Sequence, residues 1–286
     1  MVSAYRRRVI RALALGVLAA LVSTGFTPAR AAAPLPGRIV SLIPSLTEDL
    51  FAIGAGAEVV GVSQYTDFPA AARRLPVVAG FESLSTERVL ALHPDLVVGI
   101  VSQAHLTDDL RRAGVRVVLF HDDSLSDLEA NLRRLGALTG RPAAANALLA
   151  RLRARTAALT RSVVSHRRRP SVFVVLGTAP IFTVGEGSYI ARLIELAGGT
   201  NAAANLPAPY GRYSGEALLA RQPDAIVVDP AVRFGEVAAN APWNALRAVR
   251  EHRVYTLPDA AILERPGPRY NEGLAWLIDT LRSAAS

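Results

Sequence analysis

The chain has 286 residues, 51% of them hydrophobic, with no cysteine and a formal net charge of +8. The lack of cysteine excludes disulfides, thiolate metal sites and a cysteine nucleophile. Five of the 32 basic residues lie in the first 33 positions, which hold no acid, so the remainder keeps 27 basic and 24 acidic residues. That near balance excludes the strongly basic surface typical of nucleic-acid-binding proteins.

Residues 1–33 have the organisation of a secretory signal peptide. A basic segment with Arg6, Arg7 and Arg8 precedes an apolar run of about 15 residues, and Ala31–Ala33 fits a cleavage site. The run is shorter than the roughly 20 residues needed to span a bilayer, which favours cleavage over a membrane anchor. Since no cysteine could carry a lipid, we expect a free, soluble protein in the periplasm of a two-membrane bacterium.

Strand-like and helical patterns alternate after this segment. Two helix starts have capping-box spacing, Ser45–Glu48 and Ser126–Glu129. The alternation predicts an α/β lobe with a largely parallel sheet over 34–141. Its expected strands lie at 38–43, 59–62, 95–100 and 115–120, and its expected helices at 45–54, 86–92, 106–113 and 126–138.

A helical pattern without glycine or internal proline covers 142–168. At 1.5 Å per residue such a helix would approach ~40 Å, which suggests a rigid backbone helix between two lobes. A long surface helix within one domain is the alternative. The pattern after it predicts a second α/β lobe over 169–286, with strands at 171–176, 225–229 and 254–257 and helices at 189–197, 216–220 and 271–282.

An internal repeat relates the two halves. Residues 85–98 match residues 214–227 without a gap, with Ser, Glu, Leu, Ala, Pro and Asp at the same positions. Each copy reads as a short helix, a proline stop and a buried strand. We therefore predict two similar α/β lobes joined by one long rigid helix, with a ligand cleft between the lobes.

Glu87 and Glu216 occupy the same position in the two copies. An acid in the first turn complements the helix dipole, so a structural role is one reading. A pair of acids at matching corners would also suit a partner with two basic sockets. Both readings stay open from the residues alone.

Enzyme motifs are absent from the sequence. The five histidines are scattered, and neither His-Glu-x-x-His nor Gly-x-Ser-x-Gly occurs. The stretch His121–Asp123 could bind a metal, but a solvated loop is favoured. The stretch Gly185–Ser188 could hold an anion, but a plain N-cap at Ser188 is favoured.

Aromatic and arginine side chains gather in the expected loops. Such groups can hold a large, partly anionic chelate in a shallow cleft, although loop packing is the alternative for each aromatic. They are Tyr65, Phe68, Phe81, Tyr210, Tyr213, Arg265, Arg269 and Tyr270.

Several segments together resemble the periplasmic metal-chelate-binding proteins of ABC importers, which serve the uptake of vitamin B12, iron-siderophores and haem. The resemblance implies two α/β lobes around a cleft, and a protein that delivers its cargo to a permease without performing chemistry. The segments that carry it are 38–48, 60–69, 75–81, 183–188, 264–269 and both repeat copies.

The resemblance also implies roles for single residues. One glutamate per lobe docks on arginines of the permease dimer, and these positions fall on Glu87 and Glu216. The pattern is most similar to members that bind vitamin B12, although an aspartate of their cleft falls near Ala261. The implied ligand-binding residues here are Tyr65, Phe81, Ile100, Tyr210 and Arg265.

These features together predict a monomeric carrier with no resident cofactor or metal and no catalytic residues. Its favoured cargo is a cobalt corrinoid, and a ferric siderophore or haem is the alternative. Three other functions remain possible on the residues: a receptor for free metal ions, a secreted α/β enzyme, and a sensor that presents its ligand to a membrane receptor.

Overall fold

The computed structural model describes residues 34–80, 82–163 and 169–285. The predicted signal peptide and its cleavage site, Phe81 and the end of the predicted connector therefore lie outside the described residues. Residues 35–286 form one compact unit. In the part of the chain that the structure describes, no helix has the length and apolarity needed to cross a membrane.

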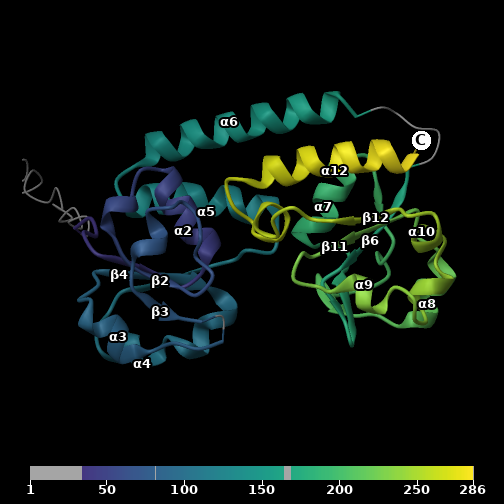
Figure 1. Cartoon of the computed structure of the whole chain (residues 1–286). Coiled ribbons are helices and arrows are strands. Elements are labelled where there is room, and N and C mark those ends of the chain that lie inside the picture. Colours follow the sequence, from purple (N-terminus) through teal and green to yellow (C-terminus); the bar gives the residue numbers. More distant parts are fainter. Residues whose placement is uncertain (1–33, 81, 164–168, 286) are drawn as a thin grey trace, which may run out of the picture. The chain divides into compact units, whose positions relative to one another are not determined.

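The N-terminal lobe is built on a five-stranded parallel sheet with the order β3-β2-β1-β4-β5 (Figure 1). Its strands are short and almost fully buried, as expected for a parallel sheet covered by helices. They are β1 (Ile39–Ser41), β2 (Val59–Ser63), β3 (Val77–Ala79), β4 (Leu96–Ile100) and β5 (Val117–Phe120). The helices around them are α2 (Pro44–Ala52), α3 (Thr86–Ala91), α4 (Asp108–Arg112) and α5 (Leu125–Leu138).

The C-terminal lobe has a four-stranded parallel sheet with the order β12-β11-β6-β9 and a small antiparallel sheet, β10-β8-β7, that the alternation did not predict. The parallel strands are β6 (Ser171–Val175), β9 (Thr200–Asn201), β11 (Ala225–Val228) and β12 (Val254–Thr256). The antiparallel strands are β7 (Gly177–Thr178), β8 (Ile181–Val184) and β10 (Tyr210–Arg212). The helices are α7 (Tyr189–Leu196), α8 (Gly215–Arg221), α9 (Phe234–Val237), α10 (Arg247–Arg250), α11 (Ala261–Glu264) and α12 (Tyr270–Ala285).

The two lobes have the same topology around their first strands. β1 lies between β2 and β4, and β6 lies between β9 and β11 in the same way. The repeat copies supply α3 with β4 and α8 with β11, which confirms the duplication predicted from the sequence.

The repeat also preserves details of local structure. Ser85 and Ser214 cap their helices, each accepting a hydrogen bond from the backbone N–H three residues on. His93 and Gln222, which end the helices, both have φ 45°, a left-handed turn that stops a helix before the following proline.

An aspartate follows that turn in each copy and binds the start of the neighbouring strand. Asp95 Oδ2 accepts from the backbone N–H of Gly37 and Arg38, both at 2.9 Å. Asp224 Oδ2 accepts from the backbone N–H and the hydroxyl of Ser171, also at 2.9 Å. The repeated aspartate therefore sets the register of the first strand in each lobe.

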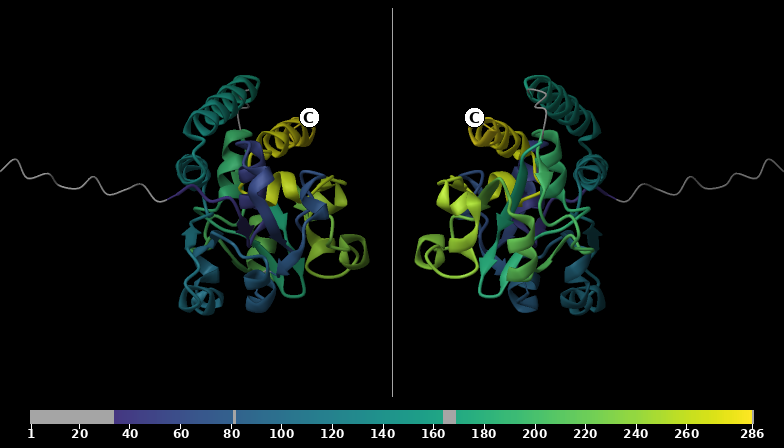
Figure 2. Two further views of the ribbon diagram at one scale, coloured as in Figure 1. Left: turned by 90° about the vertical axis from the view of Figure 1, so that its left-hand side faces the viewer. Right: turned by 90° about the vertical axis from the view of Figure 1, so that its right-hand side faces the viewer.

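One long helix, α6 (Pro142–Arg161), connects the lobes and runs beside α12 on one side of the sheets (Figures 1 and 2). The Thr156 hydroxyl lies 2.6 Å from the Tyr270 hydroxyl, and Asn271 donates to the Leu152 carbonyl at 3.0 Å. A single hydrophobic cluster runs from the first sheet through α6 and α12 to the second. The boundaries predicted at 141/142 and 168/169 stay a prediction, because this core is continuous across them.

Both predicted capping boxes are wrong. α2 begins at Pro44 and has no side-chain cap, since proline is favoured in the first turn, and α5 is capped by Ser124 rather than Ser126. The two glutamates of those patterns bind arginines instead. Glu48 pairs with Arg269, and Glu129 pairs with Arg153 of α6.

Candidate functional site

A cavity of about 630 Å³ opens where the parallel strands of both lobes end. Ligands bind at the carboxyl ends of strands in open α/β sheets because the loops there diverge. The volume falls within the range of roughly 300–1,000 Å³ that is usual for small-molecule sites. Its N-terminal-lobe lining is Leu42, Ile43, Pro44, Ser45, Ser63, Gln64, Tyr65, Ile100, Ser102, Asp122 and Asp123, and its C-terminal-lobe lining is Tyr210, Asp229, Ala260, Ala261, Glu264, Arg265 and Pro266.

Four of the five predicted ligand-binding residues line this cavity: Tyr65, Ile100, Tyr210 and Arg265. They come from four separate segments of the chain, and the fold brings them to one place. The fifth, Phe81, lies outside the described residues. Contact of these residues with a ligand stays a prediction.

Tyr65 lies at the mouth of the cavity. It follows β2 with φ 65°, an uncommon conformation for a residue other than glycine, and the residue is 69% exposed. Arg265 Nη2 donates to its backbone carbonyl at 2.9 Å and so holds the turn. An exposed aromatic ring on a fixed turn is available to stack on a ligand.

Tyr210 lies on the other wall, at the start of β10 and opposite Val184 of β8. Burial, followed by the negative charges of Asp122, Asp123 and Glu264, raises the pKa of its phenol above the ordinary value. Its hydroxyl therefore keeps its proton at every physiological pH and can donate a hydrogen bond to a ligand.

Four carboxylates face the same cavity: Asp122, Asp123, Asp229 and Glu264. Burial and the charges of Asp123 and Asp127 raise the pKa of Asp122 to about 6. Burial and the charge of Asp229 raise the pKa of Glu264 to about 8. Near neutral pH, Asp122 is therefore mostly ionised and Glu264 mostly protonated.

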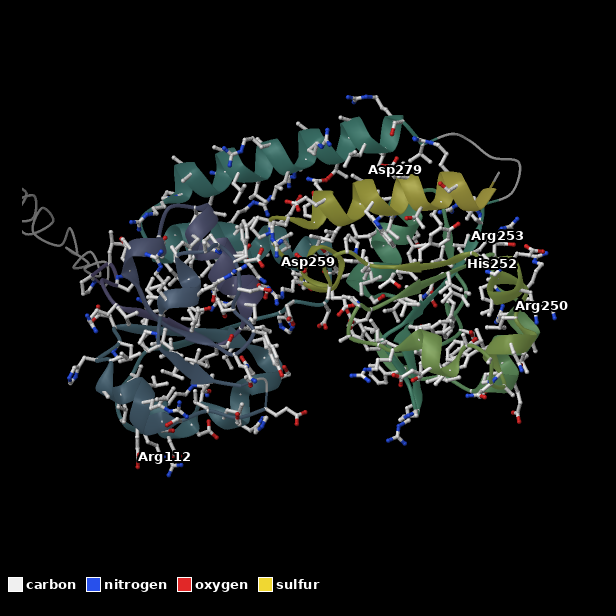
Figure 3. The ribbon with its side chains drawn as sticks, viewed as in Figure 1. Arg112, Arg250, His252, Arg253, Asp259 and Asp279 are labelled. Atoms are coloured by element: carbon white, nitrogen blue, oxygen red, sulfur yellow. The ribbon has the colours of Figure 1, made fainter. Side chains whose placement is uncertain are left out.

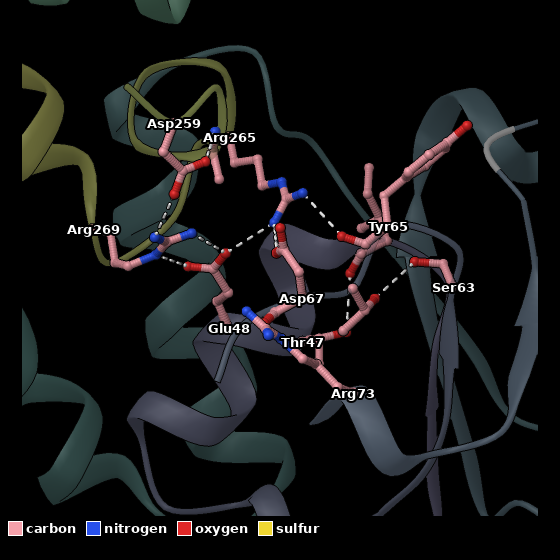
Figure 4. A network of polar contacts seen from close by, with 12 residues as sticks. Thr47, Glu48, Ser63, Tyr65, Asp67, Arg73, Asp259, Arg265 and Arg269 are labelled. Carbon is pink, nitrogen blue, oxygen red and sulfur yellow. Dashed lines mark hydrogen bonds and ion pairs between the residues drawn. The ribbon is translucent and has the colours of Figure 1, made fainter. Parts of the chain in front are cut away.

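An ionic clamp joins the two lobes beside the cavity (Figure 4). Arg269 donates to both carboxylate oxygens of Glu48, from Nε to Oε2 at 2.9 Å and from Nη2 to Oε1 at 3.0 Å. Arg265 Nη1 binds Asp67 Oδ1 at 2.5 Å and contacts Glu48 Oε1 at 3.4 Å. Asp259, labelled between the lobes in Figure 3, accepts from Arg269 Nη1 at 3.2 Å.

The clamp changes the interpretation of the arginine expected to contact ligand. Arg265 lines the cavity, but its guanidinium already binds two carboxylates and a backbone carbonyl. The Arg269 guanidinium lies 4.3 Å from the centre of the Phe68 ring, so Phe68 packs against the clamp. Arg265 and Arg269 therefore form ion pairs that connect the C-terminal lobe to the N-terminal lobe.

Glu87 and Glu216 lie far from these interactions in sequence, in the first turns of α3 and α8, and both are exposed. Both helices are on the opposite side of the sheets from α6 and α12 (Figure 1). In this position each carboxylate complements the dipole of its helix, and both carboxylates stay accessible to a partner.

Sequence reasoning missed most of the acidic residues. The stretch His121–Asp123 is a loop with His121 and Asp123 exposed, as predicted, but Asp122 and Asp123 also line the cavity, which the sequence analysis did not predict. Asp229 follows β11, so its place at a strand's carboxyl end was the signal that could have found it. In the described part of the chain, no group of three potential ligands could hold a metal ion. Ser188 does cap α7, as expected, with the Ala191 backbone N–H donating to its hydroxyl at 3.0 Å.

Known proteins similar to this chain match most of its length. The family model described as "Periplasmic binding protein" matches residues 39–261. An uncharacterised ABC transporter substrate-binding lipoprotein of Bacillus subtilis, YvrC, is 30% identical over 86% of this chain and 80% of its own.

Two solved structures show the same architecture. The periplasmic haem-binding protein RhuT of Roseiflexus is 30% identical, with a TM-score of 0.78 over 87% of this chain and 99% of that one. The periplasmic vitamin B12 binding protein BtuF of Vibrio cholerae is 28% identical, with a TM-score of 0.76 over 88% of this chain and 99% of that one.

Proposed function

The chain belongs to the periplasmic binding protein family, and we propose that it captures a metal chelate in the periplasm and delivers it to the permease of an ABC importer. The observation that carries the proposal is the cavity of about 630 Å³ between two lobes of similar topology, which Tyr65, Ile100 and Tyr210 line. The relatives named as a substrate-binding and as a vitamin B12-binding protein support it.

The favoured cargo is a cobalt corrinoid. A flat macrocycle matches a cavity lined by an exposed tyrosine from one lobe, a half-buried tyrosine from the other and the apolar Ile100. Phe81 remains part of this proposed site. Haem is the second candidate because a haem-binding structure shares the fold at 30% identity.

Delivery depends on docking, for which we propose Glu87 and Glu216. Both are exposed at equivalent positions of the repeat, one on each lobe. Two equivalent carboxylates can form ion pairs with basic residues of a permease built from two subunits, and such pairs set orientation.

Binding is favoured over catalysis. The described residues that line the cavity include no histidine and therefore no serine–histidine pair. Raised pKa values at Asp122 and Glu264 follow from burial and neighbouring acids, which structural groups also show. A carrier that serves a sensor instead of a permease would have the same cavity, and only the docking experiment separates these two functions.

Calorimetric titration and absorption spectra test the cargo. Purified protein is mixed with cyanocobalamin, haemin or ferrioxamine B, passed through a desalting column, and examined for retained colour. We expect retention of cyanocobalamin, and an affinity loss of about tenfold in Tyr210→Ala but not in Phe182→Ala, which removes an exposed ring outside the cavity. Retention of haemin alone would transfer the proposal to haem, and retention of no chelate would contradict it.

A further inference from the structure

We propose that the cleft selects chelates that present no negative charge to it, that Asp122 and Asp229 are the residues that select by charge, and that Glu264 offers a hydrogen bond to the chelate. This inference rests on the proposed function and adds the chemical class of the cargo: a neutral or cationic chelate with N–H donors at its edge. It differs from the partly anionic cargo that the loop arginines suggested from the sequence.

The acids lie on both walls of the cavity. Asp122 and Asp123 follow β5 in the N-terminal lobe, while Asp229 follows β11 and Glu264 ends α11 in the C-terminal lobe. A ligand between the lobes therefore has carboxylates on either side. An anionic group placed there would meet like charges in a partly desolvated site, where repulsion is strong.

The neighbouring basic groups offset these acids only in part, since the charge of Arg265 acts to lower the pKa of Glu264 but its guanidinium is bound elsewhere. Arg265 is the only basic residue among the described residues that line the cavity, and it is bound to Asp67, Glu48 and the Tyr65 carbonyl. Arg269 is bound to Glu48 and Asp259 in the same clamp. An anion could recruit either guanidinium only by breaking these contacts.

Groups behind the N-terminal wall add to the negative charge. Asp127 of α5 and Asp123 both act to raise the pKa of Asp122, while His121 opposes them. His121 is exposed, so its effect is screened by water. The balance at this wall is negative whenever Asp122 is ionised.

Glu264 offers a hydrogen-bond acceptor, which favours a cargo with N–H donors. Its Oε1 is buried and has no hydrogen-bond partner among the described residues. A buried oxygen of this kind requires a partner, which a ligand in the cavity can supply. The protonated Glu264 carboxyl shares its proton with Asp229, in a hydrogen bond that helps to raise its pKa, so Glu264 Oε1 is left to accept an N–H from a ligand, such as that of a primary amide.

Matched pairs of probes isolate charge from shape. Cyanocobalamin is neutral, and its monocarboxylic acid derivative replaces one side-chain amide with a carboxylate. Ferrioxamine B carries a free ammonium group, and its N-acetyl derivative is neutral. For each pair, the dissociation constant is measured by calorimetry at pH 7 and at high and low salt.

We expect the less negative member of each pair to bind at least about tenfold more tightly, with the preference smaller at high salt. The isosteric double variant Asp122→Asn/Asp229→Asn should lower this ratio several-fold. The control Glu186→Gln removes an exposed acid outside the cavity and should leave the ratio unchanged. Circular dichroism establishes that each variant is folded, and the wild-type ratios do not depend on any variant.

The outcomes separate this inference from the proposed function. A protein that binds the monocarboxylic acid as tightly as cyanocobalamin, or haemin more tightly than either, overturns the charge selection and leaves a chelate-binding protein. A preference that persists undiminished in the double variant overturns the assignment of the residues. A protein that binds none of these chelates contradicts both.

Discussion

Arg269 and Glu48, 221 residues apart, form a two-bonded ion pair at the junction of the two lobes. Glu48 is only 2% exposed, and its carboxylate is bound by this partner and by Arg265. The pair connects α2 of the N-terminal lobe to the segment before α12, and so fixes the cavity wall that Arg265 and Pro266 complete.

Replacement of Glu48 tests the clamp. In Glu48→Gln the two arginines lose their shared carboxylate, and removal of one partner from a buried pair destabilises by about 3 kcal/mol. Urea unfolding measures the change. The control Glu236→Gln, which breaks an exposed pair with Arg233, should alter the free energy of unfolding by less than about 0.5 kcal/mol. Equal stability of the two variants would show that the clamp adds nothing.

Glu264 predicts how stability varies with pH. Its pKa is raised in the folded protein to about 8 from an ordinary 4.5, so the folded state is penalised once the carboxyl ionises. This contribution to stability is complete below about pH 4.5, is lost progressively as pH rises from there, and is fully lost above about pH 8. The free energy of unfolding of Glu264→Gln, relative to that of the wild type, should therefore rise by roughly 2–5 kcal/mol between pH 5 and pH 9. Parallel stability profiles of the two proteins would contradict the raised pKa.

Gly185 should be irreplaceable, because an alanine Cβ there would lie 2.0 Å from the Ala208 carbonyl oxygen and 2.6 Å from that of Leu206. Both carbonyls belong to the loop that leads into β10 and Tyr210. Gly185→Ala should cost about 2 kcal/mol in urea unfolding and weaken chelate binding. Gly235→Ala, whose Cβ meets open space, is the matched control and should be neutral or slightly stabilising. A stable Gly185→Ala protein with normal binding would show that this loop moves freely.

Charge reversal tests docking. Glu87→Arg/Glu216→Arg should abolish uptake of labelled cobalamin in cells that lack their own binding protein, because both contacts with basic sockets become repulsive. Cobalamin titration with the purified variant should be unchanged, since neither residue lines the cavity. Glu82→Arg, an exposed acid nearby in the sequence, is the control. Normal uptake by the double variant would exclude these residues as the docking contacts.

The fold could be predicted because its signals are local and repeated. Buried strand patterns such as Leu96–Ile100 and Ala225–Val228, and the gapless match of 85–98 to 214–227, needed no knowledge of distant contacts. The two capping boxes failed for the opposite reason. Glu48 and Glu129 have ordinary spacing for capping acids, and only the folded chain shows the arginines that bind them.

The site was predictable only in part. Tyr65, Tyr210 and Arg265 stand out as loop aromatics and a loop arginine, Ile100 comes from the family resemblance alone, and all four do line one cavity. The acidic group of the cavity could not be predicted, because Asp122, Asp229 and Glu264 lie in unrelated segments and become one group only when the two lobes meet. The same holds for Arg265, whose partners Asp67 and Glu48 lie in the other lobe.

The repeated cap, turn and aspartate place Glu87 and Glu216 identically within their lobes. Each lobe therefore presents one exposed carboxylate at an equivalent position of the repeat. If these carboxylates dock as we propose, a receptor made of two identical subunits would accept the carrier in two orientations of approach instead of one, which would halve the rotational search.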